Sequence, residues 1–484
     1  MTTKESDFVV GSHIAHSGKD SIKDVESKSD DKEKTGEENV FETHEGEMEF
    51  KTLKWPMAAI VMTKIQFGLG ILSVPSAFAS LGAVPGIIIL LLMAAMTTWG
   101  SMVTYRFRHF HRSTHSVPDI AMIMGGEPAR IAIFSFYILY IAFVLGAQIL
   151  SISIAFNAIT AHGTCTVVFT VVAMILVTII GSFRTYRMLS WLSWIGVLAV
   201  LSSVLILTIA LGVGPDRPAA APAVGPYDKE VVATKSTTLA DAMLAIVNLL
   251  FAYAASPMFV SIVPEMPNPK DFPKALYVCQ ASITVVYIAL GVTIYYYTGQ
   301  YIASPALGSA NEIIKRVSYG VALVGLIAGG SNIAHSLSIS VFVQAMRNSP
   351  HFKANNWVFW AVWIGCVAGV SVFSFIIASS VPFFNALLGL IGSVFSAFFC
   401  LGFPSAVWFY LFWAQEPNRS WTASFKSRSV SLWLKAVMNA GIILITLFIA
   451  AAGLYASVES IDNQFATGSV GQPFSCADTS NTSG

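Results

Sequence analysis

The chain has 484 residues, of which 55% are apolar by type and 11% are charged, and its formal net charge is +1. Soluble globular proteins carry about 25% charged residues, so this composition excludes an ordinary soluble domain. The sequence has no basic cluster dense enough for phosphate binding, so a nucleic-acid partner is not expected.

Charge is concentrated at the N-terminus. Residues 1–54 hold 14 of the 27 acidic residues and 8 of the 28 basic ones. This polar segment cannot bury enough apolar surface to offset its chain entropy, which predicts a disordered cytosolic tail. The rest is expected to form a transmembrane domain over residues 55–458 and a short extracellular tail over residues 459–484.

Long apolar runs follow the tail. A membrane-spanning helix needs about 20 apolar residues, because the hydrocarbon core is about 30 Å thick. Eleven runs meet this requirement, so the expected fold is all-α and integral to the membrane. They cover residues 56–81, 83–105, 131–160, 164–183, 189–213, 241–263, 275–299, 318–346, 356–379, 382–413 and 436–457.

The loops between these runs set the orientation, because Lys and Arg favour the cytosolic side. With the N-terminus inside, the cytosolic loops hold 14 Lys and Arg residues and the external loops hold five. An odd number of spans then puts the C-terminus outside. The expected location is the plasma membrane, with the vacuolar membrane as the alternative.

Two spans contain helix-weakening residues at matching places. Gly68, Gly70 and Pro75 interrupt the first span, and small residues before Pro257 interrupt the sixth. Transporters built from two repeats often open each repeat with a discontinuous helix that carries the binding site. For each break alone, an ordinary kink or close helix packing is the alternative.

Unwound backbone suits a zwitterion. Free N–H groups at a half-helix N-terminus hold a carboxylate, and free carbonyls accept from an ammonium group. The substrate-binding candidates are Gly68, Leu69, Gly70, Ile71, Phe251, Ala252, Tyr253, Ala254 and Tyr140.

Three segments resemble the amino acid/auxin permease family, most of all its fungal neutral amino acid permeases. They are residues 68–75 (GLGILSVP), residues 263–276 (VPEMPNPKDFPKAL) and residues 383–392 (FFNALLGLIG), within a resemblance over about residues 50–458. The resemblance implies a leucine-transporter-like fold of five-plus-five inverted repeats, with broken first and sixth helices. It also implies import of neutral aliphatic and aromatic amino acids with protons. The alternatives are an amino-acid-sensing receptor without net transport, a channel, and a vacuolar exporter.

Lys64 and His335 are the ionisable residues deepest in the spans, and intramembrane charges are functional candidates by default. Many relatives are uncharged where this chain has Lys64. The coupling candidates are Lys64, His335, Asn332 and Ser336. The alternatives are a Lys64 that extends to the cytosolic surface and a neutral His335 bonded to a neighbouring helix.

Further candidates have structural alternatives. Asp241 and Glu265 lie at the two ends of the sixth span and are candidate gates. Asp241 is alternatively a charge at a helix N-terminus, and Glu265 alternatively pairs with loop cations. Gln148 and Asn248 either line a pocket or join helices by hydrogen bonds.

The sequence contains no catalytic set and no metal-spaced Cys or His, so neither an enzyme nor a cofactor is expected. The expected partners are neutral L-amino acids, protons and the lipid bilayer. Cys165 and Cys476 are both expected outside, where they either pair or stay as free thiols.

Overall fold

The computed structural model describes residues 53–183, 186–213, 218–222, 228–346, 349, 356–414, 430–466 and 472–478. The N-terminal segment 1–54, expected to be disordered and cytosolic, lies outside these residues except for Leu53 and Lys54.

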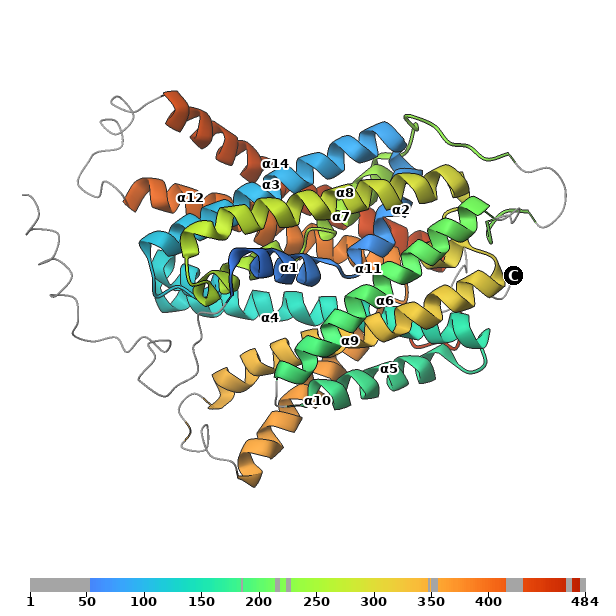
Figure 1. Ribbon diagram of the computed structural model, residues 1–484, viewed down its shortest axis with the longest axis horizontal. Coiled ribbons are helices and arrows are strands. Elements are labelled where there is room, and N and C mark those ends of the chain that lie inside the picture. Colours follow the sequence, from blue (N-terminus) through green and yellow to red (C-terminus); the bar gives the residue numbers. More distant parts are fainter. Residues whose placement is uncertain are drawn as a thin grey trace, which may run out of the picture. The chain divides into compact units, whose positions relative to one another are not determined.

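The described residues form helices that follow the apolar runs in chain order (Figure 1). The α-helices are α1 (Trp55–Gln66), α2 (Gly70–Leu81), α3 (Ala83–Phe110), α4 (Val117–Thr160), α5 (Thr166–Gly181), α6 (Tyr186–Val213), α7 (Leu239–Phe251), α8 (Phe272–Thr298), α9 (Glu312–Met346), α10 (Trp357–Ser380), α11 (Phe384–Ile391), α12 (Phe403–Ala414) and α14 (Val430–Ala466). Two other helices matter for the site, the 3-10 helix η1 (Ser256–Glu265) and the π-helix η5 (Gly392–Gly402).

Within the described residues, nine helical segments are long and apolar enough to cross a membrane. One of these nine, Leu239–Glu265, combines α7 with η1. In addition, α1 and α2 pass the same test together and are bent by 62° at a short break, whereas α5 is a shorter apolar helix. The chain is therefore an all-helical, multi-pass membrane protein, and the count of eleven spans stays a prediction.

Several helices extend beyond the apolar runs. α4 consists of two helical parts separated by non-helical backbone at Gly125 and Gly126. The first part begins at Val117, where Ser116 and Asp119 form a capping box, and the second part contains the predicted span 131–160. α14 covers Val430–Ala466 rather than residues 436–457. An apolar run predicts the part of a helix inside the bilayer, whereas capping and helix propensity determine where the helix ends.

The helices form two groups, and the interrupted helices lie between them. One group contains α4, α5, α6, α9 and α10, and the other contains α3, α12 and α14. α4, α5, α9 and α10 pack on one another, and α6 packs along α9. α5, α9 and α10 lie along the lower edge of Figure 1, and α3, α12 and α14 lie on the opposite side. α2 packs on α7 and α8, and α1 packs on α8, so α8 contacts both halves of the first interrupted helix.

Glycines allow close approach at three helix crossings, α2 with α3, α2 with α8, and α6 with α9. A Cβ added at Gly86 of α3 or Gly291 of α8 would lie 2.5 Å or 2.6 Å from the ring of Phe78, which is fully buried in α2. A Cβ at Gly325 of α9 would lie 2.5 Å from the carbonyl oxygen of Gly196 in α6. Small residues at such contacts are how membrane helices pack closely.

Residues 472–478 lie against α5 and the end of α10. Cys476 forms a disulfide with Cys165, directly before α5. The hydroxyl of Thr166 donates to the carbonyl of Ala477 at 2.6 Å, and the amide of Phe474 donates to the carbonyl of Ser379 at 3.2 Å. Of the two states that the sequence left open for these cysteines, the structure has the bonded one.

Candidate functional site

A cavity of about 210 Å³ lies where α1, α2, α4, α6, α7 and α9 meet. Pockets for drug-sized ligands measure roughly 300–1,000 Å³, so this cavity suits a smaller molecule. The residues predicted from sequence that line it are Lys64, Gly68, Leu69, Gly70, Tyr140, Gln148, Phe251, Ala252, Ala254, Asn332 and Ser336.

The first interruption consists of residues 67–69, between α1 and α2. The two helices meet at 62° here, and Phe67 has a non-helical ψ of 89°. A Cβ added at Gly68 would meet nothing within 4 Å, whereas a Cβ at Gly70 would lie 2.6 Å from Cα of Ala252. Gly68 therefore faces open space, and Gly70 packs directly on the backbone of the second interruption.

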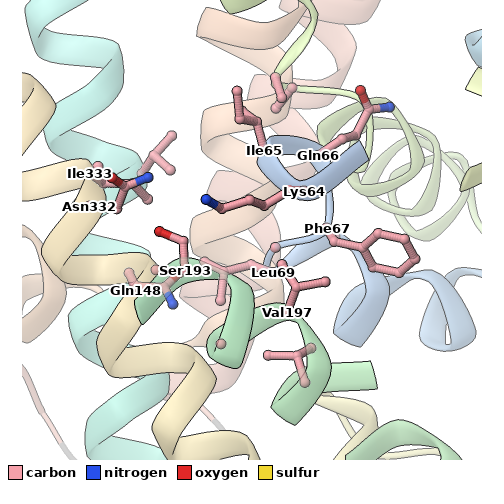
Figure 2. Close-up of a pocket in the computed structure, with 18 of the residues that line it drawn as sticks. Lys64, Ile65, Gln66, Phe67, Leu69, Gln148, Ser193, Val197, Asn332 and Ile333 are labelled. Atoms are coloured by element: carbon pink, nitrogen blue, oxygen red, sulfur yellow. The ribbon is translucent and has the colours of Figure 1, made fainter. Parts of the chain in front are cut away.

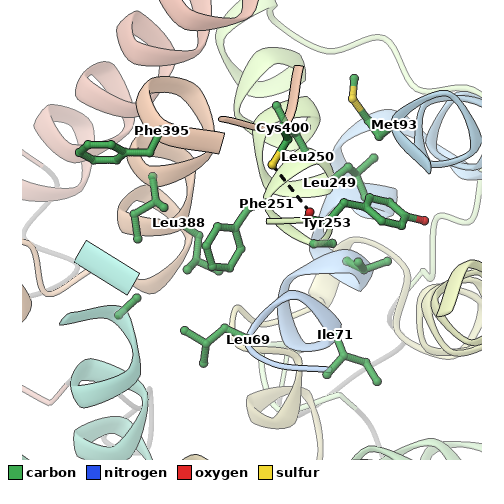
Figure 3. Packing of buried hydrophobic residues seen from close by; sticks show 14 of the residues in the cluster. Leu69, Ile71, Met93, Leu249, Leu250, Phe251, Tyr253, Leu388, Phe395 and Cys400 are labelled. Atoms are coloured by element: carbon green, nitrogen blue, oxygen red, sulfur yellow. Dashed lines mark hydrogen bonds between the residues drawn. The ribbon is translucent and has the colours of Figure 1, made fainter. Parts of the chain in front are cut away.

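The second interruption consists of residues 252–255, between α7 and η1. Three other elements hold its carbonyl groups. The Tyr140 hydroxyl of α4 donates to Ala254 at 2.7 Å, and the Tyr287 hydroxyl of α8 lies 3.2 Å from the oxygen of Ala252. The Cys400 thiol of η5 contacts the oxygen of Tyr253 at 3.8 Å (Figure 3). The second interruption is thus fixed from three sides.

Lys64 brings a charge to the cavity. Figure 2 shows its amine pointing toward Ser193 of α6 and Asn332 of α9, while Gln66 points away. The Lys64 Nζ also lies 5.5 Å from the centre of the Trp194 ring, a cation–π distance. The side-chain oxygen of Asn332 is buried and accepts no hydrogen bond from the residues that the structure describes. This side of the cavity is therefore polar and cationic.

Three predicted site residues do not line the cavity. Ile71 is buried inside α2, two residues after the end of the interruption. The Tyr253 hydroxyl lies 2.8 Å from the Thr284 hydroxyl of α8, and its ring points away from Phe251 in Figure 3. His335 Nδ1 lies 3.0 Å from the carbonyl oxygen of Gly181, so its imidazole faces α5. The His335 contact corresponds to the structural alternative, a histidine bonded to a neighbouring helix.

The two candidate gating residues also lie outside the cavity. The amide of Asp241 donates to the Thr238 hydroxyl at 3.1 Å, and that hydroxyl donates to the Asp241 carboxylate at 2.7 Å. Asp241 therefore belongs to the N-terminal cap of α7. The Glu265 side chain is exposed, and its carbonyl accepts from the amide of Leu53 at 3.1 Å. Glu265 thus joins the end of η1 to the chain before α1.

Two polar candidates join helices. The Gln148 amide of α4 donates to the carbonyl of Leu326 in α9 at 2.9 Å, while the residue also lines the cavity. The Asn248 amide of α7 donates to the Asn385 side chain of α11 at 2.5 Å.

Sequence reasoning missed two contributors. α6 supplies Ser193 and Gly196 to the cavity, but nothing in its apolar run distinguishes these residues. Tyr287 of α8 contacts the last residue of α1, Gln66, and the second interruption without lining the cavity. A signal for α8 was present, because Gln280, Thr284 and Tyr287 recur at helical spacing in an otherwise apolar segment.

Residues 51–458 match the family described as transmembrane amino acid transporter protein. The chain belongs to this family. It is 32% identical over 450 residues to a transmembrane transporter of Gibberella moniliformis, covering 93% of each chain. It is also 27% identical over 438 residues to the N amino acid transport system protein of Neurospora crassa, covering 90% of this chain and 91% of that one.

Solved structures show the same fold at low sequence identity. The nucleobase-cation-symport-1 family transporter MHP1, closed with bromovinylhydantoin bound, matches with a TM-score of 0.51 at 13% identity, over 89% of this chain and 96% of that one. MhsT in complex with L-phenylalanine matches with a TM-score of 0.50 at 11% identity, over 81% and 98%. The chain is therefore an all-helical membrane protein of an amino acid transporter family, and it shares the fold of these two transporters.

Proposed function

We propose that the chain imports neutral aliphatic and aromatic amino acids across the plasma membrane by proton symport. The observation that carries this proposal is the cavity between the two interruptions, which Gly68 and Ala252 both line and whose described lining residues include no Asp or Glu. A cationic substrate side chain would lie unpaired there, beside Lys64, at a cost of several kcal/mol. The name of the Neurospora relative and the L-phenylalanine in MhsT agree with such a substrate.

We also propose eleven spans in two inverted repeats of five and one further helix. The nine long segments, the bent pair α1–α2 and the shorter α5 together make eleven. The pairs α1–α2 and α7–η1 are then the broken first and sixth helices. With the loop charges of the sequence, this count puts the N-terminus in the cytosol and the C-terminus outside.

The carboxylate group of the substrate binds the backbone of residues 68–71. The ammonium group of the substrate binds the carbonyls of residues 251–254. α2 begins at Gly70, so its first N–H groups and the positive end of its dipole favour an anion. The Tyr140 hydroxyl, bonded to Ala254, keeps the second interruption in position.

Lys64 couples transport to protons, with Asn332 and Ser336 as its neutral partners on α9. Lys64 precedes Gly70 by six residues, about 9 Å at helical rise, and borders the same cavity. It alternates between protonated and neutral states as the site opens to either side. His335 acts as a contact between α9 and α5, Glu265 gates the inner end, and Asp241 supports the outer end of α7.

The test is uptake of a panel of labelled amino acids into proteoliposomes, with and without an imposed pH gradient. We expect neutral amino acids to accumulate only when the outside is more acidic. Accumulation that needs sodium instead would contradict proton coupling. Binding without uptake would identify a sensor, and flux without accumulation would identify a channel.

A further inference from the structure

α8 carries a buried polar stripe that faces the two interruptions. Gln280, Thr284 and Tyr287 are spaced at i, i+4 and i+7, so they share one helix face. Their exposed fractions are 4%, 6% and 0%. Buried polar groups need hydrogen-bond partners, and the Gln280 side-chain oxygen and the Thr284 and Tyr287 hydroxyls find them in or next to the interruptions.

Two residues of the stripe, Gln280 and Thr284, each bond to a single partner, at the end of α1 and in the second interruption respectively. The Gln66 amide, at the end of α1, donates to the Gln280 side-chain oxygen at 3.3 Å. The Thr284 hydroxyl lies 2.8 Å from the hydroxyl of Tyr253, a residue of the second interruption. Each of these bonds joins α8 to one interruption through a side chain.

Tyr287 bonds at once to the end of α1 and to the second interruption, and both of its partners are backbone carbonyls. Its hydroxyl lies 3.2 Å from the carbonyl oxygen of Gln66 and 3.2 Å from that of Ala252. A hydroxyl has one proton, so the two carbonyls share it, at distances longer than the usual value of about 2.7–2.8 Å. The ring also makes edge contacts with Phe67 and Tyr253.

The position of Tyr287 separates it from direct substrate contact. It is fully buried and is not among the residues that line the cavity, whereas Gln66 and Ala252 are. Any effect of Tyr287 on substrate must therefore pass through the backbone of the interruptions.

We propose that Tyr287 is a positioning residue that couples the two interruptions, fixing the spacing of the Gln66 and Ala252 carbonyls so that both segments open and close together. The coupling stands on these contacts alone. Its second consequence, that this spacing tunes recognition of the substrate ammonium group, rests on the proposed function.

Hydrogen exchange of the full-length protein in lipid nanodiscs tests the coupling without any substrate. Tyr287→Phe is expected to raise amide exchange roughly 3- to 10-fold in peptides from both interruptions, residues 66–72 and 250–258, because one shared hydrogen bond is lost. The matched controls are Thr284→Val, expected to affect only residues 250–258, and Gln280→Leu, expected to affect only residues 66–72. Faster exchange in one segment only, or in neither, after Tyr287→Phe would overturn the coupling.

Uptake by the same variants in proteoliposomes tests the second consequence. Tyr287→Phe is expected to raise KM roughly 3- to 10-fold while Vmax per molecule stays nearly constant. A fall in Vmax with unchanged KM would overturn the role in recognition and indicate a merely structural residue. If the wild-type protein accumulates no amino acid of the panel, the proposed function fails, while the exchange experiment still decides the coupling.

Discussion

The two interruptions border one cavity but differ in what holds them. In the first, Gly68 has open space around its Cα, and Lys64 brings a charge within two turns. In the second, residues 252–254 are uncharged, and α4, α8 and η5 each contact one of their carbonyls.

This difference separates two tasks. A segment whose carbonyls are contacted from three sides is a fixed reference for a ligand, because its hydrogen bonds must break before it moves. A segment with open space and a charge can respond to ligand and proton. We infer that the second interruption holds the substrate and that a response of the first interruption to ligand or proton reaches it through Tyr287.

The largest expected effect concerns the contact between the interruptions. A branched side chain at Gly70 cannot fit 2.6 Å from Cα of Ala252, so Gly70→Val should abolish uptake while protein still reaches the cell surface. The measurement is uptake normalised to surface protein. The matched pair Gly70→Ala and Gly68→Ala adds the same methyl group at both sites. Only Gly70→Ala should lower the melting temperature, because a methyl at position 68 enters open space. Normal uptake by Gly70→Val would show that the two segments separate easily.

A cationic substrate tests the effect of the Lys64 charge, which lies in α1 just before the first interruption. Arginine should be taken up roughly 100-fold less efficiently than phenylalanine, since its guanidinium would lie unpaired beside Lys64. Competition between unlabelled arginine and labelled phenylalanine measures this ratio. Equal competition by the two amino acids would contradict the neutral preference.

Removing the charge should separate coupling from binding. Lys64→Met is expected to lower accumulation driven by a pH gradient roughly 10-fold or more, since that charge is the proposed proton carrier. Exchange of internal for external substrate should survive, because the substitution leaves the hydrogen bonds that hold the second interruption unchanged. The control Trp194→Leu removes only the ring beside Lys64 and should keep pH dependence. If Lys64→Met accumulated substrate like the wild type, the coupling role would be excluded, and Lys64 would be a residue that extends to the cytosolic surface.

Loss of the hydrogen bond between the Tyr140 hydroxyl and the second interruption should have a smaller effect on uptake. Tyr140→Phe removes the hydroxyl that donates to Ala254 at 2.7 Å. The loss of one neutral hydrogen bond to a backbone carbonyl should raise KM roughly 3- to 10-fold. Asn248→Ala serves as a comparison, because the partner of the Asn248 side chain is Asn385 of α11 rather than a residue of the interruption. A Tyr140→Phe variant with unchanged KM would mean that this hydrogen bond is not needed.

The sequence predicted the helical architecture well, because long apolar runs have few alternatives in a membrane. It also identified Gly68, Gly70, Phe251 and Ala252 as candidates, and the cavity borders all four. It could not predict which face of a helix turns toward the cavity. Tyr253 lies next to Ala252 in the chain, yet its side chain points to α8.

The smallest expected effect on transport lies far from both interruptions. The disulfide Cys165–Cys476 joins the C-terminal segment to the start of α5, and neither cysteine lines the cavity. If the interruptions carry transport, Cys165→Ser with Cys476→Ser should leave uptake within about twofold, while the melting temperature falls because the bridge restrains the unfolded chain. Intact mass after alkylation without reductant should show both cysteines unmodified in the wild type. Modification of both would exclude the bridge. A large loss of uptake at an unchanged melting temperature would mean that the outer end of α5 takes part in transport, and the division of tasks between the two interruptions would then be incomplete.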